Sequence, residues 1–200
     1  DVNDGGTQFT AVKTFLRAHD LAEDGNGDVI QFVNHQAQGL VHNEDMVCTK
    51  NNVHIRALSR GITFKAATPG GTVLKIGDDT GTNGYGCSVA GMLIDGDLNG
   101  AIPADYCMQV NGKFCAVNYM WLKQATLDCL QFRGGDYHTI VDGEIEKAGR
   151  HGVSTFDAGL PSGSPREITI YGRSNIYLNQ SSGVYIGGTG ALGSTTRLIR

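Results

Sequence analysis

A short motif recurs along most of this chain, and it restricts the possible folds more than any other feature. Each copy has two mostly apolar residues separated by one position, followed a few positions later by another apolar residue. The copies are Cys87-Ser88-Val89 with Ile94, Cys115-Ala116-Val117 with Leu122, His138-Thr139-Ile140 with Ile145, and Ile168-Thr169-Ile170 with Ile176. Equivalent residues are about 23–30 positions apart, which is in the range of solenoid repeats.

A second motif alternates with the first and has a similar period. Its copies are Tyr106-Cys107-Met108, Asp128-Cys129-Leu130, Gly152-Val153 and Gly183-Val184. A repeat of this length, made of short strands and turns, cannot bury its inner face alone, so its copies must stack on one another. Two alternating motifs therefore predict a solenoid of about six or seven coils, each about 4.8 Å high.

Stacking places equivalent residues above one another, which predicts the core. The first motif gives one inward column of Cys87, Cys115, His138 and Ile168, and an adjacent column of Val89, Val117, Ile140 and Ile170. Glycine makes up 29 of the 200 residues, as expected for many short strands joined by tight turns. We expect insertions to leave the coils through these turns, which explains the uneven period.

One amphipathic helix is expected, over residues 7–24. Phe9, Val12, Phe15, Leu16 and His19 fall on one face at helical spacing. Thr7 is the expected N-cap and Gly25 follows the end. We therefore expect residues 1–28 to form an entry and capping helix that covers the open end of the solenoid, and residues 29–200 to form its coils.

Charge and cysteine content exclude several classes of function. A net charge of −4 argues against a basic nucleic-acid-binding protein, and no apolar run reaches the roughly 18 residues that cross a bilayer. None of the five cysteines lies in a CxxC motif, and an odd number cannot pair completely within one chain. We interpret them as buried thiols made in a reducing compartment. Motifs for nucleotide or zinc binding are absent from the sequence.

Several segments resemble the right-handed parallel β-helix of the pectate-lyase-like superfamily, in the form found in bacteriophage tailspikes and tail fibres. The resemblance covers about residues 4–190. It is carried by Asp4-Gly5-Gly6-Thr7, Gly27-Asp28-Val29-Ile30-Gln31-Phe32, Asn52-Val53-His54-Ile55-Arg56, Leu93-Ile94-Asp95-Gly96-Asp97-Leu98-Asn99-Gly100 and Ser174-Asn175-Ile176-Tyr177-Leu178-Asn179. It implies an all-β, right-handed parallel β-helix with one short N-terminal capping helix.

The resemblance also implies a location and partners. We expect a protein of the virion tail, made in the host cytoplasm, or alternatively a secreted one. Expected partners are a bacterial surface polysaccharide, two further copies in a homotrimer, and other virion tail proteins, without nucleic acid or a membrane span. The chain begins with Asp1, and tailspikes are longer, so we expect it to be part of a longer protein.

Three functions remain open, because one fold supports many activities. The chain could depolymerise a polysaccharide as a glycoside hydrolase or polysaccharide lyase, bind a glycan without cutting it, or act as a structural virion rod. The strongest polar cluster for catalysis is Arg133, Asp136, His138, Asp142, Glu144, Glu146, Arg150 and His151. Alternatively, these are ordinary solvated residues of the turns, with His138 buried in the core.

Paired carboxylates can divide acid and base roles at a glycosidic bond. The expected catalytic residues are Glu144, Asp157, Asp142 and Glu146. Asp157 lies in the longest late insertion, and Glu144, Glu146, Asp157 and Glu167 would line one groove. The expected substrate-binding residues are Arg133, Trp121, Tyr171 and Arg166, because aromatic rings stack on sugars and cations pair with uronates.

No cofactor is expected, with calcium as the one alternative. The segment Asp95-Gly96-Asp97-Leu98-Asn99-Gly100 matches the first half of an EF-hand loop. Tyr106 stands where such a loop needs its last ligand, a glutamate, and no flanking helices are expected. Asp side chains that bond to the backbone of a tight turn are the alternative interpretation.

Overall fold

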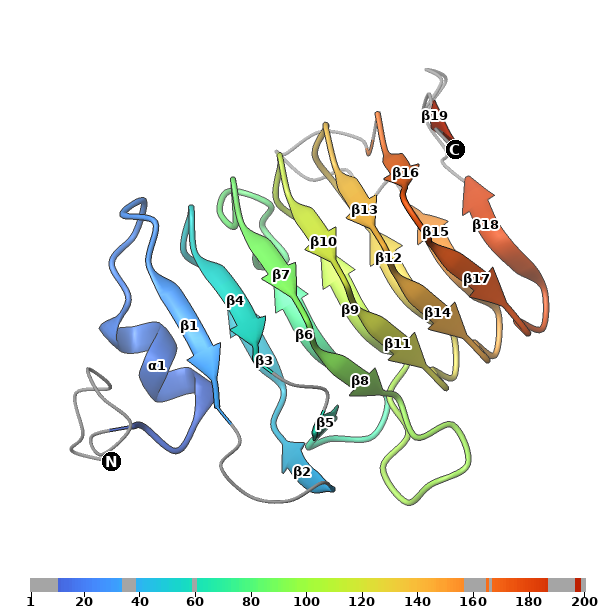
Figure 1. The fold of residues 1–200 in the computed structure, drawn as a ribbon, viewed down its shortest axis with the longest axis horizontal. Coiled ribbons are helices and arrows are strands. Elements are labelled where there is room, and N and C mark those ends of the chain that lie inside the picture. The colour runs from blue at the N-terminus through green and yellow to red at the C-terminus, as the bar shows by residue number, and fades with distance from the viewer. Residues whose placement is uncertain are drawn as a thin grey trace.

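The computed structural model describes residues 11–33, 39–58, 61–156, 165, 167–186 and 197–198. Its strands form three parallel sheets, and each ladder joins a strand to the strand three places further along the chain. One strand of each sheet therefore makes up one coil of a right-handed parallel β-helix, as the sequence predicted (Figure 1).

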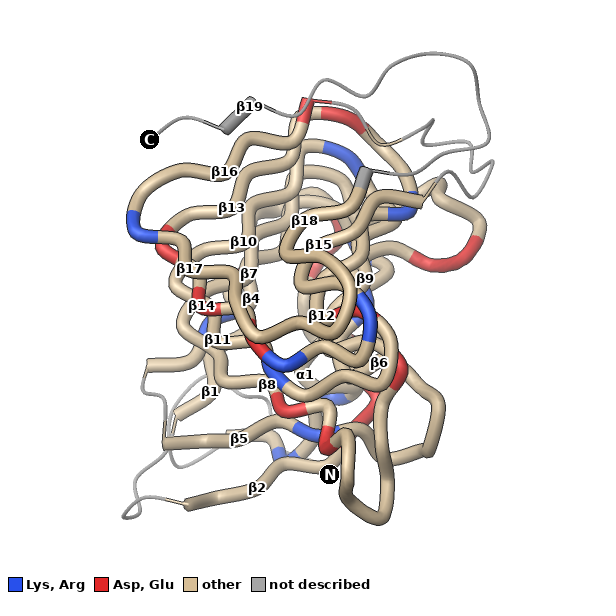
Figure 2. Tube along the Cα trace, turned by 90° about the vertical axis from the view of Figure 1, so that its right-hand side faces the viewer, with Lys and Arg blue, Asp and Glu red and all other residues tan. Residues whose placement is uncertain are grey.

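The three sheets are named here in the order in which the chain enters them. Sheet A contains β1 (Val29–Phe32), β4 (His54–Ala57), β7 (Ser88–Ala90), β10 (Ala116–Asn118), β13 (Thr139–Val141), β16 (Thr169–Tyr171) and β19 (Arg197–Leu198). Sheet B contains β2 (Leu40–Asn43), β5 (Ile62–Lys65), β8 (Leu93–Asp95), β11 (Trp121–Lys123), β14 (Glu144–Glu146) and β17 (Asn175–Tyr177). Sheet C contains β3 (Met46–Cys48), β6 (Thr72–Ile76), β9 (Tyr106–Val110), β12 (Asp128–Phe132), β15 (His151–Thr155) and β18 (Ser182–Ile186). Viewed along the long axis, sheet C lies opposite sheets A and B (Figure 2).

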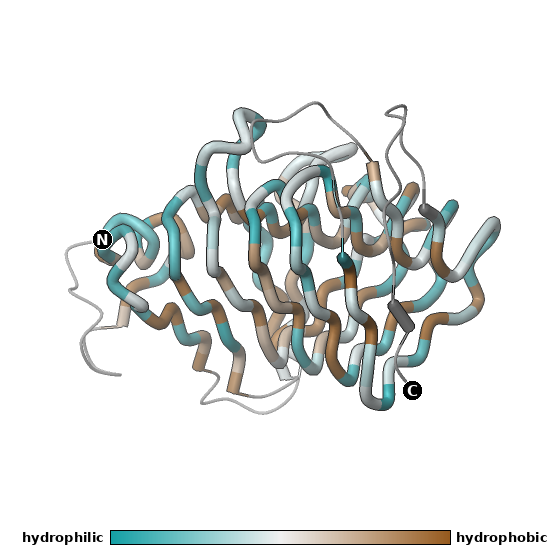
Figure 3. Tube along the Cα trace, turned by 90° about the horizontal axis from the view of Figure 1, so that it is seen from above, coloured by the Kyte–Doolittle hydropathy of each residue, from teal (hydrophilic) through white to brown (hydrophobic). Residues whose placement is uncertain are grey.

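The two predicted core columns are confirmed, since Cys87, Cys115, His138 and Ile168 are all buried and the adjacent column aligns in sheet A. In sheet A, Val117 pairs with Val89 and Ile140, and Ile140 pairs with Ile170. The apolar residues at the strand centres of sheets B and C stack in the same way. Apolar and polar residues alternate along the coils, so each coil adds its apolar side chains to one continuous core (Figure 3).

All five cysteines are buried and none is in a disulfide. Cys87 donates from Sγ to the carbonyl of Lys50, and Cys115 donates to that of Gly84. These contacts confirm the interpretation of the cysteines as buried thiols.

The corner between sheets C and A has the same backbone conformation in successive coils. Its residue lies two positions before each sheet A strand and has a positive φ: 82° at Gly27, 53° at Asn52, 56° at Phe114 and 61° at Tyr137. Glycine and asparagine adopt this left-handed conformation readily, whereas a bulky residue costs roughly 1–2 kcal/mol. The spacing of the repeat is therefore irregular, but the backbone conformation at this corner is the same from coil to coil.

The helix α1 runs over Phe15–Leu21. The prediction of a helix over residues 7–24 is therefore wrong at residues 11–14 and 22–24, which are not helical. Thr14 is the N-cap, and the expected cap Thr7 lies outside the described residues. The Glu44 carboxylate accepts the backbone N–H of Phe15 at 2.7 Å and that of Leu16 at 2.9 Å. A side chain from the first coil thus fixes the start of the helix, a long-range effect that periodicity cannot reveal.

The expected position of the helix is confirmed. It packs on β1 and β3, which are the first strands of sheets A and C, at the N-terminal end of the solenoid (Figure 1). Phe15 and His19 point into this contact and are buried. The helix therefore covers strand edges that would otherwise be open to another chain.

Candidate functional site

The outer face of sheet B brings together three of the residues that the sequence singled out. In β11, β14 and β17 the central residue points inward, so the two flanking residues share the outer face. Trp121 pairs with Glu144, and Lys123 pairs with Glu146, which in turn pairs with Tyr177. We call Trp121, Lys123, Glu144, Glu146 and Tyr177 the sheet B site.

Glu146 is the buried carboxylate of the sheet B site, with 5% of its surface exposed. The indole N–H of Trp121 donates to its Oε1 at 3.3 Å, and the amine of Lys147 lies 3.4 Å from its Oε2. Hydrogen bonds to a carboxylate offset the cost of burying its charge. Glu146 therefore holds the indole ring in a fixed orientation on the face.

Glu144 is more exposed than Glu146 and contacts the next coil. The hydroxyl of Tyr177 donates to its Oε1 at 2.9 Å. This hydrogen bond, together with the nearby carboxylates, raises the pKa of Tyr177 to about 12. The hydroxyl is therefore protonated at neutral pH, and the exposed Tyr177 side chain orients Glu144 at the surface.

Lys123 joins the aromatic and acidic parts of the site. Its Nζ lies 5.5 Å from the centre of the Trp121 ring and 3.2 Å from Oδ2 of Asp95 in β8. A cation over an indole face is attracted by the ring's electrons. The outer face therefore presents an aromatic ring, a lysine and the more exposed carboxylate of Glu144, groups that can contact a sugar ring and accept hydrogen bonds from hydroxyl groups.

The two glutamates are neighbours on one strand face. They are separated by one residue, so their Cα atoms lie about 6.7 Å apart. Their surroundings differ, since Glu146 bonds to Trp121 and Lys147 whereas Glu144 bonds to a tyrosine hydroxyl.

Asp142 lies close to this pair in sequence but has a structural role. It forms the corner between β13 and β14 with φ 50°, and its carboxylate accepts the backbone N–H of Arg173 in the next coil. Aspartate is one of the few residues that tolerate this conformation. Asp142 therefore supports the corner, and its carboxylate is engaged away from the sheet B site.

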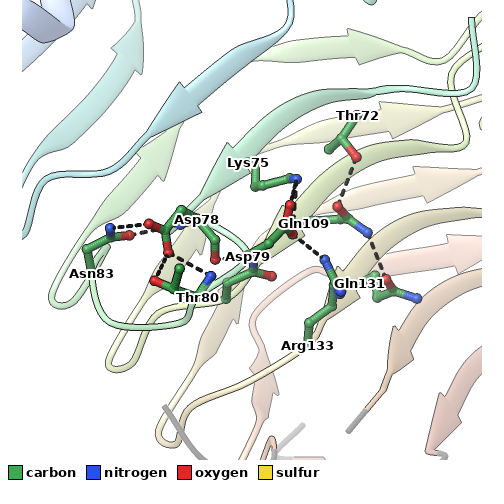
Figure 4. Close-up of polar contacts among 10 residues, drawn as sticks. Thr72, Lys75, Asp78, Asp79, Thr80, Asn83, Gln109, Gln131 and Arg133 are labelled. Atoms are coloured by element: carbon green, nitrogen blue, oxygen red, sulfur yellow. Dashed lines mark hydrogen bonds and ion pairs between the residues drawn. The ribbon is translucent and has the colours of Figure 1, made fainter. Parts of the chain in front are cut away.

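The expected substrate-binding residues lie on different faces. Arg133 follows β12 on sheet C, and its Nη1 lies 2.7 Å from Oδ1 of Asp79 (Figure 4). Tyr171 is exposed in sheet A. Only Trp121 of this set belongs to the sheet B site, while Asp157 and Arg166 lie outside the described residues.

Of the four residues predicted to line one groove, Glu144 and Glu146 share the outer face of sheet B, and Asp157 lies outside the described residues. Glu167 lies at the corner between sheets C and A, with φ 50°, and not on sheet B. The eight-residue polar cluster is likewise spread around one coil, with His138 fully buried as the alternative interpretation required. The chain of one coil passes through all three sheets in turn. Residues that are close in sequence can therefore lie on different faces of the solenoid.

Two residues of the sheet B site were not among the predicted catalytic and substrate-binding residues. Lys123 and Tyr177 each lie one position after an inward residue, Leu122 and Ile176, that the repeat had identified. Collecting the residues that flank each inward column would have found both. The repeat in the sequence therefore already indicated the positions of these two residues.

The half EF-hand segment forms a turn held by lysines. Oδ1 of Asp95 accepts the backbone N–H of Asp97 at 2.9 Å, as in an Asx turn. Lys65 pairs with Asp97 at 2.9 Å, and Lys123 pairs with Asp95. No three metal-ligating side chains converge in the described ranges, and calcium binding stays a prediction of the sequence.

None of the described segments contains a helix long and apolar enough to cross a bilayer. No family model, curated protein or solved structure matches the chain in comparisons with known proteins.

Proposed function

We propose that this chain belongs to a tailspike-like or tail-fibre-like protein of a bacteriophage and binds a bacterial surface polysaccharide on the outer face of sheet B. The observation that carries the proposal is the contact of Trp121 with Glu146 and of Tyr177 with Glu144, on one face of three consecutive coils. The same proposal includes assembly of three copies into a homotrimer and contact of that trimer with other tail proteins.

The chemistry of the sheet B site suits a saccharide. Aromatic rings stack on the C–H faces of sugars, and carboxylates and a tyrosine hydroxyl bond to sugar hydroxyls. The site extends over three coils, about 10 Å between the outer two. A ligand that contacts both Trp121 and Tyr177 is therefore longer than one sugar ring, as a polysaccharide is.

Depolymerisation is the second candidate, and the two glutamates favour it. They share a face and differ in their partners, as the acid and base of a glycosidase do. A hydrolase would add water across the cleaved bond, whereas a lyase would leave an unsaturated sugar. A structural rod without a ligand is the remaining alternative.

Binding is tested with purified protein against a panel of bacterial surface polysaccharides by calorimetry. Trp121→Ala should weaken binding at least about tenfold, because buried aromatic contacts dominate such interfaces. Tyr171→Ala, which removes an exposed ring from sheet A, is the matched control and should change little. Loss at Tyr171 instead would move the site to sheet A, and no binding of any glycan would favour the structural rod.

Cleavage is tested on a polysaccharide that binds, with products followed by mass spectrometry and ultraviolet absorbance. Glu144→Gln and Glu146→Gln should each reduce the rate by orders of magnitude if the pair is catalytic. Binding by Glu144→Gln should persist, since the amide still accepts hydrogen bonds. Cleavage that continues at the wild-type rate in both variants would exclude this pair as the acid and base.

A further inference from the structure

Two cations on sheet C share one carboxylate, although they come from coils that are two steps apart. Lys75 in β6 places Nζ 3.1 and 3.2 Å from the two oxygens of Asp79, and Arg133 places Nη1 2.7 Å from Oδ1 (Figure 4). The intervening coil contributes Gln109, which pairs with Lys75 on one side and with Gln131 on the other. The two residues therefore come from strands on either side of Gln109, and their charged groups converge on one carboxylate oxygen.

The cations and their counter-ion are held very differently. The side chains of Lys75 and Arg133 are only 19% and 23% exposed, whereas that of Asp79 is 64% exposed. Asp79 lies in the loop after β6, which is fixed mainly through Asp78 and Asn83. The two cations are therefore built into the wall of the solenoid, and the carboxylate reaches them from outside.

The floor between the cations is polar and internally satisfied. Thr72 donates to the amide oxygen of Gln109, and the amide nitrogen of Gln109 donates to Gln131 at 2.9 Å. Both glutamines are buried. This floor therefore has a fixed shape that does not depend on Asp79.

The guanidinium of Arg133 has N–H groups that Asp79 does not use. It uses one N–H group on Asp79, and the described residues provide no second hydrogen bond to it. Arginine offers five N–H groups in a planar fork that matches carboxylate and phosphate oxygens in pairs. With two cations and one carboxylate, the cluster also carries an excess positive charge in a protein of net charge −4.

We propose that Lys75 and Arg133 form an oxyanion-binding site, and that the Asp79 carboxylate fills the place of the ligand's anionic group in the free protein. The ligand class is a carboxylate, sulfate or phosphate group, carried by a sugar or free in solution. The site lies on sheet C and does not depend on the proposed glycan contact on sheet B. Partial loss of hydration disfavours the charged form of Asp79, but hydrogen bonds and charge from Lys75 and Arg133 outweigh it and lower the pKa of Asp79, so the carboxylate is charged at neutral pH and competes with other anions.

Self-occupation has a measurable consequence. A ligand sees only the fraction of molecules in which the site is free, so its apparent affinity is reduced by that fraction. If Asp79 fills the site about nine-tenths of the time, removing its charge should tighten anion binding about tenfold. An ordinary structural ion pair would show no such gain.

The experiment compares the wild-type protein with Asp79→Asn, titrated with glucuronate, inorganic sulfate and inorganic phosphate, with neutral glucose as the blank. We expect Asp79→Asn to bind at least one of these anions about tenfold tighter than the wild type, and added salt to weaken that binding. Preference for glucuronate would identify a planar carboxylate as the ligand group, and preference for the other two would identify a tetrahedral oxyanion. Arg133→Gln in the Asp79→Asn background should abolish the gain.

Asp97→Asn is the matched control. It also frees a lysine, Lys65, from an ion pair, and the side chains of that pair are 25% and 26% exposed. No arginine takes part in that pair, so no gain in anion binding is expected. Asp79→Ser repeats the test with a smaller side chain should Asp79→Asn fail to fold. An equal gain in Asp97→Asn, or no gain in either Asp79 variant, would overturn the proposal.

Discussion

Asp128 and Arg150 form a two-point ion pair between adjacent coils, with the carboxylate fully buried and the guanidinium partly exposed. Arg150 donates from Nε at 2.8 Å and from Nη2 at 2.6 Å. The hydroxyl of Ser154 and the backbone N–H of His151 also donate to the same carboxylate. Burial opposes ionisation of Asp128, but these donors outweigh it and lower its pKa.

We expect Asp128→Asn to lower the free energy of unfolding by about 3 kcal/mol, because it leaves Arg150 without its counter-ion and replaces an acceptor by a donor. Urea unfolding at neutral pH measures the change. Arg150→Lys keeps the charge but loses the fork, so it should cost less. A loss for Asp128→Asn no larger than that of an exposed substitution would show that the pair contributes little.

His138 predicts how stability depends on pH. It is fully buried beside Phe132, with Nε2 2.9 Å from the carbonyl of Gly134, and burial lowers its pKa to about 4. The unfolded chain binds this proton near pH 6.5, so the stabilising effect is complete above that pH and is lost as the pH falls toward 4. The total loss is about 3 kcal/mol.

Unfolding measured between about pH 7 and about pH 3, a range that brackets both pKa values, tests this expectation. His138→Phe should keep the ring stack and make the decline shallower. Some slope should remain, since burial also lowers the pKa of His19. An unchanged slope in His138→Phe would assign the acid sensitivity to other groups.

The cysteines test how tightly the coils close. Burial raises the pKa of the Cys115 thiol, which removes the reactive thiolate at neutral pH. We expect an aromatic disulfide reagent to leave all five thiols unmodified in the native protein and to modify all of them in urea. Rapid modification of Cys87 or Cys115 without denaturant would show that the coils open locally.

The sequence predicted the stacking but not which polar side chains meet. Repeating apolar residues such as Val89 and Val117 align because every coil buries the same positions, so periodicity alone determines their register. Contacts between turns depend on loop lengths that carry no period. Asp79 reaches Arg133 across 54 residues only because the loop after β6 folds toward sheet C. The contact of Glu44 with the N–H of Phe15, which fixes the start of α1, likewise joins residues far apart in sequence.

The last prediction concerns the side chains that bond to the two ends of α1. Glu44 caps the start of the helix, and the amine of Lys50 donates to the carbonyls of His19 at 2.6 Å and Asp20 at 3.2 Å at the other end. A helix of 7 residues is not stable alone, so its position depends on these contacts and on Phe15. Lys50→Met keeps the apolar stem and removes the donors.

We expect Lys50→Met to speed hydrogen exchange in α1 and to increase association of the protein at high concentration, because β1 and β3 then present open strand edges. Exchange followed by mass spectrometry, with light scattering, measures both effects. Lys113→Met, at the corner where Lys113 lies over Tyr85, removes a lysine far from the helix and should change neither. Faster exchange without association would mean that a loosened helix still covers the edges, whereas unchanged exchange would show that Phe15 and Glu44 hold the helix without Lys50.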